Sequence, residues 1–171
     1  AERMRAEGLE VEGLSVGSTP AMTRVVDLAG VTEARPGNYA LFDYTQVVLG
    51  SCTAADCAAT VLASVVSAPP DATRAVIDAG GLALSKEPSH PGAPGPTAGE
   101  IYEDYTQGVL SSSLRVVSLS QEHGVLSAGR PIGDQVRILP NHSCLSMACF
   151  DECVVVEGDR VVDRWRIHRG R

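Results

Sequence analysis

From about residue 35 onward the chain consists of short apolar runs separated by Gly, Pro and Asp, and this pattern limits the possible fold more than any other feature. The runs are rich in Val, Ile, Leu and Tyr, which favour β-strands. They lie at 38–44, 58–67, 73–78, 114–119, 123–127, 134–139, 152–157 and 160–168. Only Gly158 and Asp159 separate the last two runs, which is the spacing of a tight hairpin. We therefore predict a mostly β domain over residues 35–171.

Residues 1–34 have a different character and predict part of a parallel α/β structure. Residues 1–9 read as the end of an amphipathic helix, and residues 9–16 then alternate apolar and polar side chains as a strand does. A Gly-Ser-Thr-Pro loop follows, and residues 20–29 predict a short helix that Gly30 ends. One such step cannot bury its own strand. We expect it to pack on an upstream part that is missing here or on a partner, and predict residues 1–34 to be a barrel-like remnant.

Composition excludes two classes of partner. The 171 residues carry a net charge of −7, whereas nucleic-acid binding needs clustered Lys and Arg. No apolar run approaches the ~20 residues that a membrane helix requires.

The five cysteines are odd in number and form no small secreted framework, so we expect a reduced, cytoplasmic setting. The chain begins without Met and directly in a helical pattern, from which we expect a fragment or a processed chain.

The first candidate site is the segment from Pro140 to Cys144, which follows an apolar strand pattern. In extended backbone, residues two apart point to the same side, so His142 and Cys144 could meet one ion. Imidazole and thiolate together suit zinc, although two ligands need a third from water, substrate or elsewhere. The alternative is a buried cysteine beside a hydrogen-bonded histidine, and the spacing alone favours this alternative.

The second candidate is Gly17-Ser18-Thr19, at the predicted strand-to-helix turn. Free N–H groups, two hydroxyls and a helix N-terminus suit a phosphate group. The same residues also fit an ordinary N-cap, in which Ser or Thr accepts a backbone hydrogen bond.

The third candidate is the turn that contains Arg35 and Gly37. Gly37 permits close approach of a ligand to the backbone, and Arg35 could hold an anion or a ring nitrogen. Tyr39 lies directly after this turn. The alternative is a simple turn with a solvated arginine.

Other polar groups indicate structure more than chemistry. Glu122 beside His123 could form an acid/base pair, but a turn between two strands is favoured. Cys149 and Cys153 lie next to two acidic residues and could extend a metal site. The valines that follow make core packing the preferred interpretation of this pair.

The order of these motifs along the chain is more specific than any one of them. It runs Gly17-Ser18-Thr19-Pro20, Arg35-Pro36-Gly37-Asn38-Tyr39, Asp56-Cys57-Ala58, Val76-Ile77-Asp78-Ala79-Gly80, Ala83-Leu84-Ser85, Glu122-His123-Gly124, Gly133-Asp134, Leu139-Pro140-Asn141-His142-Ser143-Cys144 and Val161-Val162-Asp163-Arg164-Trp165. Over nearly its whole length the chain resembles the D-threonine aldolase and D-serine dehydratase family. These are fold type III pyridoxal-phosphate (PLP) enzymes related to alanine racemase, with an N-terminal (β/α)₈ barrel that binds PLP and a C-terminal β-domain.

The resemblance implies roles for the matching residues. His142 and Cys144 match the family's metal ligands, which engage the substrate hydroxyl, and zinc or another divalent metal is implied. Ser18 and Thr19, with Gly17, match the phosphate-binding turn after a late barrel strand. Arg35 and Gly37 match the turn that meets the pyridine ring and phosphate. Tyr39 lies beside that turn as a possible lining residue, and a homodimer is implied.

One departure from the family concerns the Schiff-base lysine, which lies near the start of the barrel in these enzymes. Lys86 is the only lysine of the chain, and it does not match that position. No residue of this chain is assigned a catalytic role with certainty, and the chain alone is expected to be inactive. A smaller departure is Met147-Ala148-Cys149, which replaces a more polar stretch and leaves the substrate-side contacts open.

The sequence thus predicts the C-terminal part of a PLP- and metal-dependent lyase acting on D-3-hydroxy amino acids. Residues 1–34 would be the last βα step of the (β/α)₈ barrel, and residues 35–171 the β-domain with the metal site. Dehydratase and aldolase both remain open; the thiolate ligand favours zinc and, less strongly, the dehydratase. The alternative is a stand-alone β-domain that binds a metal or ligand, or only forms dimers, without catalysis.

Overall fold

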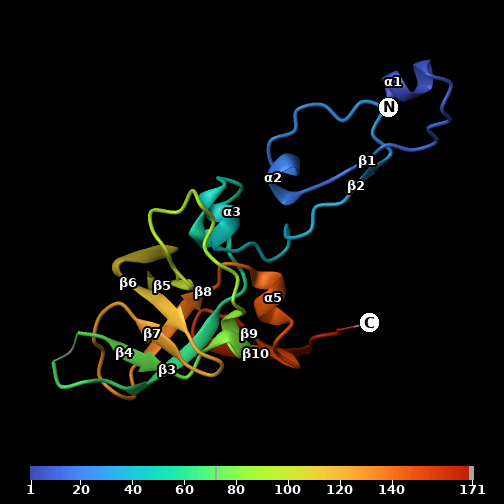
Figure 1. Ribbon diagram of the computed structural model, residues 1–171. Coiled ribbons are helices and arrows are strands. Elements are labelled where there is room, and N and C mark those ends of the chain that lie inside the picture. Colours follow the sequence, from blue (N-terminus) through green and yellow to red (C-terminus); the bar gives the residue numbers. More distant parts are fainter. Residues whose placement is uncertain (72, 170–171) are drawn as a thin grey trace.

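The computed structural model describes residues 1–71 and 73–169, and it is mostly β-structure (Figure 1). Two parts are visible: an N-terminal arm that extends away from the rest, and a barrel with short helices around it. The elements are α1 Glu2–Ala6, β1 Ser15–Val16, α2 Thr19–Met22, β2 Glu33–Ala34, α3 Tyr44–Val48, the 3₁₀ turn η1 Ala54–Asp56, β3 Val61–Ser67, β4 Ala75–Ile77, α4 Gly81–Leu84, β5 Gly99–Asp104, β6 Val109–Leu119, β7 Gly124–Leu126, β8 Gln135–Leu139, α5 Ser143–Met147, β9 Glu152–Glu157 and β10 Arg160–Arg166.

Six antiparallel strands close into a barrel in the order β3-β4-β7-β6-β5-β8. Strand β8 pairs on one side with β3, where Val61 lies opposite Ile138. It pairs on the other side with β5, where Ile101 lies opposite the same Ile138. Closure leaves none of these six strands with an unpaired long edge, which is how barrels avoid edge-to-edge association.

The barrel interior is the main core. Alternation along β3 sends Ala63 and Val65 inward, where both are 2% exposed, and leaves Leu62 55% exposed outside. The same period-2 alternation is what the sequence showed in these runs. The buried cluster inside the barrel contains Ala63, Val65, Ala75, Ile77, Ala79, Leu84, Ile101, Leu114, Val116, Leu126, Val136 and Ile138.

A second, smaller core lies where α3 and η1 cover the outer face of β5. It is formed by Tyr44, Ala54, Cys57, Tyr102 and Leu139. The Tyr102 hydroxyl donates to the Ala54 carbonyl oxygen at 2.8 Å, so its polar end is satisfied inside this apolar cluster. This cluster fixes α3 against the end of β8.

The arm comprises residues 1–36 and is less regular than predicted. Strands β1 and β2 are parallel, with two residues each. The strand predicted over 9–16 forms only at its end, and the helix predicted over 20–29 is the single turn α2. Little is buried along this segment, so local propensity alone sets the element lengths, and short helices are marginal without packing. Strand β2 was not predicted, and a domain boundary between residues 34 and 35 stays a prediction.

Two further expectations need correction. Residues 38–44 are not a strand: they form a turn that leads into α3, with Phe42 at φ 51° and Asp43 as the N-cap of the helix. The sequence did not predict strand β5, because its buried Glu100 interrupts the pattern of apolar residues. The predicted hairpin is confirmed, since β9 and β10 pair across Gly158 and Asp159.

Within residues 1–71 and 73–169, no helix has the length and apolar character that would let it cross a membrane.

We predict that Ile138→Ala lowers the free energy of unfolding by about 2–5 kcal/mol, because it empties a fully buried site between β3 and β5. Leu62→Ala on the outside of the barrel is the control, with an expected change within about 0.5 kcal/mol. Chemical denaturation measures both. Equal losses in the two variants would mean that the barrel interior is not the stabilising core.

Candidate active site

Two turns lie side by side where β1 and β2 end. Because the strands are parallel, their carboxyl ends share one edge; the Arg35 N–H donates to the Val16 carbonyl oxygen at 2.8 Å. A Cβ on Gly17 would lie 2.5 Å from the Arg35 carbonyl oxygen, so only glycine allows this approach. The structure therefore brings Gly17, Ser18 and Thr19 next to Arg35.

The two hydroxyls of the first turn are already engaged. Ser18 is the N-cap of α2, and its Oγ accepts from the Ala21 N–H at 3.2 Å. Thr19 is 3% exposed, and its Oγ1 accepts from the Asn38 N–H at 2.8 Å. Any anion here would therefore be held mainly by the backbone N–H groups at the start of the turn, which a helix leaves unpaired.

The second turn is more open. The Arg35 Nε donates to the Ser15 Oγ at 2.8 Å and is paired with the Glu33 carboxylate at 2.9 Å, with the arginine side chain 70% exposed. No atom lies within 4 Å of a Cβ placed on Gly37. Tyr39 is 63% exposed. The second turn is therefore exposed, and Gly37 faces open space.

The predicted metal ligands flank the start of α5, directly after barrel strand β8. His142 is the extended N-cap residue, with φ −140° and ψ 104°, whereas Cys144 is already helical. The expected extended backbone through Cys144 is therefore wrong. His142 is half-buried and Cys144 exposed, and no hydrogen bond of either side chain is found among the described residues. The described part of the chain contains no group of three metal-binding side chains, so at most this pair is offered.

A buried network joins these two regions. The Asp43 carboxylate accepts from the Ser143 N–H and the Gln46 N–H, both at 3.0 Å, and from the Asn38 side-chain amide. The Ser143 Oγ donates to the Asn38 Oδ1 at 2.9 Å. Asp43 is 1% and Ser143 0% exposed. Because Ser143 lies between His142 and Cys144, the network reaches the middle of the predicted ligand pair.

Asn141 holds the same loop from the other side. Its Nδ2 donates to the Thr97 carbonyl oxygen at 2.8 Å and to the Glu87 carbonyl oxygen at 3.0 Å. The backbone carbonyl oxygen of Asn141 accepts from the Thr45 hydroxyl at 2.8 Å. The loop after β8 is therefore fixed on both sides, which is the rigidity that a ligand site needs.

A buried carboxyl group lies behind this support. Burial raises the pKa of Glu100, and the Arg115 guanidinium opposes the shift. Burial and the Glu100 charge also raise the pKa of the Tyr44 hydroxyl at the start of α3. In both groups burial is the largest cause of the shift.

Asn38, Asp43 and Ser143 were not predicted as site residues. A local signal existed for Asp43, since Asp followed three residues later by Gln is typical of a helix start. Its contact with Ser143, 100 residues away, has no signal in a single sequence. The Glu122–His123 segment is a turn, as favoured: the Ser120 N–H donates to the His123 carbonyl oxygen at 2.8 Å.

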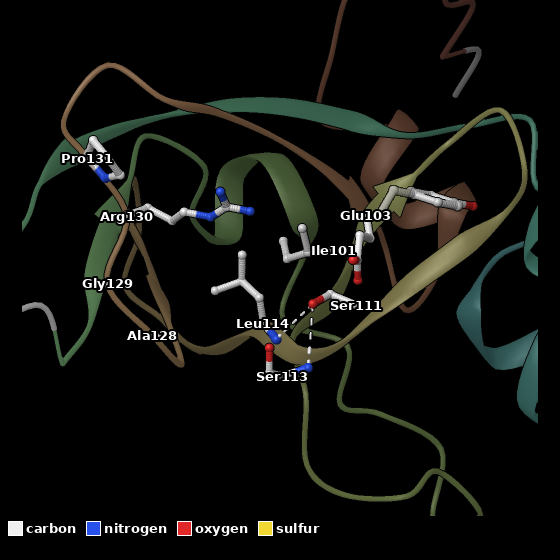
Figure 2. Close-up of a pocket in the computed structure, with 10 residues that line it drawn as sticks. Ile101, Glu103, Ser111, Ser113, Leu114, Ala128, Gly129, Arg130 and Pro131 are labelled. Carbon is white, nitrogen blue, oxygen red and sulfur yellow. Dashed lines mark hydrogen bonds between the residues drawn. The ribbon is translucent and has the colours of Figure 1, made fainter.

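A cavity lies elsewhere on the barrel. It has about 500 Å³ and lies at the mouth of the barrel where β8 begins, whereas the loop with His142 follows the end of β8. Figure 2 shows Arg130 and Glu103 reaching in from different walls, with Ile101 and Leu114 between them. None of the predicted site residues lines this cavity.

Known proteins resemble the chain over nearly its full length. D-serine dehydratase of Dictyostelium discoideum is 32% identical over 94% of this chain and 43% of its own length. D-threo-3-hydroxyaspartate dehydratase of a Delftia species is 34% identical over 98% of this chain and 47% of its own. The chain thus spans less than half of either relative. An uncharacterised protein of Mycobacterium bovis is 30% identical over 74% of this chain and 94% of its own length.

Solved structures give the same result. The Delftia dehydratase superposes with a TM-score of 0.84 at 34% identity, over all of this chain and 48% of that one. Its structures include a histidine-to-alanine variant and a cysteine-to-alanine variant in the metal-free form. An alanine racemase-like protein of Idiomarina loihiensis has a TM-score of 0.83 at 28% identity, covering 96% of this chain and 46% of that one. D-threonine aldolase of Filomicrobium marinum, at 23% identity and a TM-score of 0.70, shares the fold over 96% of this chain and 43% of that one.

The family model described as "putative serine dehydratase domain" matches residues 58–156, from the first barrel strand through the His142–Cys144 loop to β9. That match and the relatives above confirm the resemblance read from the order of the motifs: the chain belongs to the D-serine dehydratase family, and it is a mostly β, C-terminal part whose fold is shared with an alanine racemase-like protein.

Proposed function

We propose that this chain is the C-terminal part of a PLP- and metal-dependent lyase acting on D-3-hydroxy amino acids, of the dehydratase type. One observation carries the proposal: a buried hydrogen-bond network joins the glycine-dependent turns at the ends of β1 and β2 to the loop with His142 and Cys144. The dehydratases among the relatives support the reaction class.

The residues of the arm fit the phosphate end of PLP. Gly17 has no room for a side chain, and the open space at Gly37 leaves the second turn accessible. The backbone N–H groups of residues 17–19 would hold the phosphate, and Arg35 and Tyr39 would lie toward the ring. Bound PLP supplies an electron sink for chemistry at the amino-acid Cα; the arm residues would orient it.

The loop after β8 fits a divalent metal. Imidazole and thiolate form a ligand set typical of zinc, and neither side chain is committed to a hydrogen bond among the described residues. In the Delftia dehydratase the two alanine variants affect a histidine and a cysteine two residues apart, which is the spacing of His142 and Cys144. A metal there would act as a Lewis acid on the substrate β-hydroxyl. Its remaining ligands must come from water, substrate or other protein groups.

This chain does not offer a Schiff-base lysine. Lys86, its only lysine, is exposed next to α4, where its side chain lies along Gly81. We infer that the lysine belongs to a barrel segment outside these residues, and that the chain alone does not catalyse the reaction.

The exposed apolar side chains support a homodimer and further contacts of the arm. On the arm, Val26 is fully exposed and Leu9 is 55% exposed; on the hairpin, Val161 is 57% and Trp165 59% exposed. We propose that these side chains meet another part of the enzyme or the partner subunit, because contiguous exposed apolar patches mark such contacts. All five cysteines are free, which suits the cytoplasm as the location.

A second candidate is a stand-alone domain that binds a metal or ligand, or only forms dimers, without catalysis. The Mycobacterium bovis relative favours it, because 94% of that protein's length is covered by the match with this chain. Such a domain would have no need of the phosphate turns, so response to a PLP-like ligand distinguishes the two candidates.

We predict that the purified chain binds about one zinc ion, and that His142→Ala and Cys144→Ala each lose it, because zinc would be left with one protein ligand. Metal analysis after dialysis measures this. Cys149→Ala and His123→Ala are matched controls, since both residues are exposed and lie outside the loop, and both variants should keep the metal. Retention of zinc in the first two variants would reject the metal assignment.

We also predict that Gly17→Ala weakens binding of pyridoxine phosphate, which lacks the aldehyde of PLP, by about tenfold, or ~1.4 kcal/mol. A Cβ there meets the Arg35 backbone and would push the two turns apart. Fluorescence titration measures the affinity. Gly95→Ala, whose Cβ would only touch a flexible arginine end at 3.4 Å, is the control. Unchanged binding in Gly17→Ala would place the phosphate elsewhere.

A further inference from the structure

We propose that Asp43, with Asn38 and Ser143, couples the two halves of the site, so that filling the phosphate turn raises the affinity of the His142–Cys144 loop for its metal, and the reverse. This inference rests on the proposed function. Asp43 would be a positioning residue: it touches neither ligand, and it acts through the turns that hold them.

Asp43 caps two helices at once. Its Oδ1 accepts from the Gln46 N–H in α3, and its Oδ2 accepts from the Ser143 N–H, the first residue of α5. The Asn38 amide supplies a third donor. No Lys, Arg or His forms a salt bridge with this carboxylate in the described chain, so these hydrogen bonds are what compensate its burial. Moving α5 would therefore leave a buried charge short of a donor.

Asn38 connects this double cap to the arm. Its backbone N–H donates to the Thr19 Oγ1 at 2.8 Å, while its side-chain oxygen accepts from the Ser143 hydroxyl at 2.9 Å. Thr19 directly follows Gly17 and Ser18. The path from the phosphate turn to the residue between the two metal ligands thus consists of two short hydrogen bonds through one asparagine.

The arm needs such a connection to hold its position. Figure 1 shows it extending away from the barrel, and few of its residues are buried; Thr19 is the exception. Apart from the Thr19–Asn38 bond, the Arg24 side chain donates to the Leu49 carbonyl oxygen at the end of α3. An anion that orders residues 17–19 therefore orders Thr19, Asn38 and the start of α5 together. By linkage, the effect on affinity is the same in both directions.

The test is a thermodynamic cycle on the chain with zinc and pyridoxine phosphate. The affinity for pyridoxine phosphate is measured by fluorescence without and with saturating zinc. Both values are corrected for the binding of zinc to pyridoxine phosphate in buffer alone. We expect zinc to tighten binding about fivefold or more in the wild type, the lower range for allosteric coupling. In Asp43→Asn and Asn38→Ala, the ratio of the affinity with zinc to the affinity without zinc should fall to about one.

Thr45→Val is the matched control, because it removes a hydroxyl bond to the same loop, at Asn141, without touching the path through Asn38. It should keep the wild-type ratio. Circular dichroism checks folding; if Asp43→Asn does not fold, Ser143→Ala, which removes only the hydroxyl, takes its place and should lower the ratio. A merely structural role for Asp43 would change stability and leave the ratio intact.

The outcomes separate the two proposals. If the wild type binds both ligands with a ratio of one, or the variants keep its ratio, the coupling is wrong and the proposed function stands. If it binds no zinc, or no pyridoxine phosphate, the assigned site itself fails, and the coupling fails with it.

Discussion

Pairing of β8 with both β3 and β5 is the constraint on which the rest of the structure depends. A strand held on both sides cannot shift its register without turning its inward side chains outward. Because Ile138 is buried between two partners, the position of Leu139 and of the loop after it is fixed by the barrel. Asn141 then ties the loop to the segments at Glu87 and Thr97. The predicted ligand pair on this loop is therefore placed by a strand that the barrel holds on both sides.

The second support comes from a charge that the fold buries and then satisfies. An unpaired carboxylate in the interior would be strongly destabilising, but Asp43 receives three N–H donors from three separate segments. The same hydrogen bonds join α3, α5 and the turn before α3 into one unit. Replacing Asp43 by an apolar residue would leave the first turns of α3 and α5 without this hydrogen-bond acceptor. The carboxylate therefore fixes the relative position of the two helices as well as adding stability.

The sequence predicted the parts of the fold that repeat a local period. The barrel strands β3, β4, β6, β7 and β8 and the hairpin β9–β10 follow from alternating apolar residues and from turn residues between them. It failed where a distant group decides. Residues 38–44 look like a strand, yet Asp43 caps a helix there, and α5 begins at Ser143 because Asp43 receives its N–H from across the chain. At the predicted ligand pair, His142 is extended as expected, but the helix that starts at Ser143 already includes Cys144.

The two halves of the site differ in how they are held. The proposed metal half would lie on a loop fixed by a closed barrel, whereas the proposed phosphate half would lie on an arm whose strands have two residues each and cannot be stable alone. Between them, Asn38 gives its backbone to one half and its side chain to the other. The relative position of the halves is thus set in part by a few hydrogen bonds, at Thr19, Asn38 and Arg24. In such an arrangement, ligands at the two turns would favour one position of the arm against the barrel, because Thr19 and Arg24 supply its hydrogen bonds to the rest of the structure.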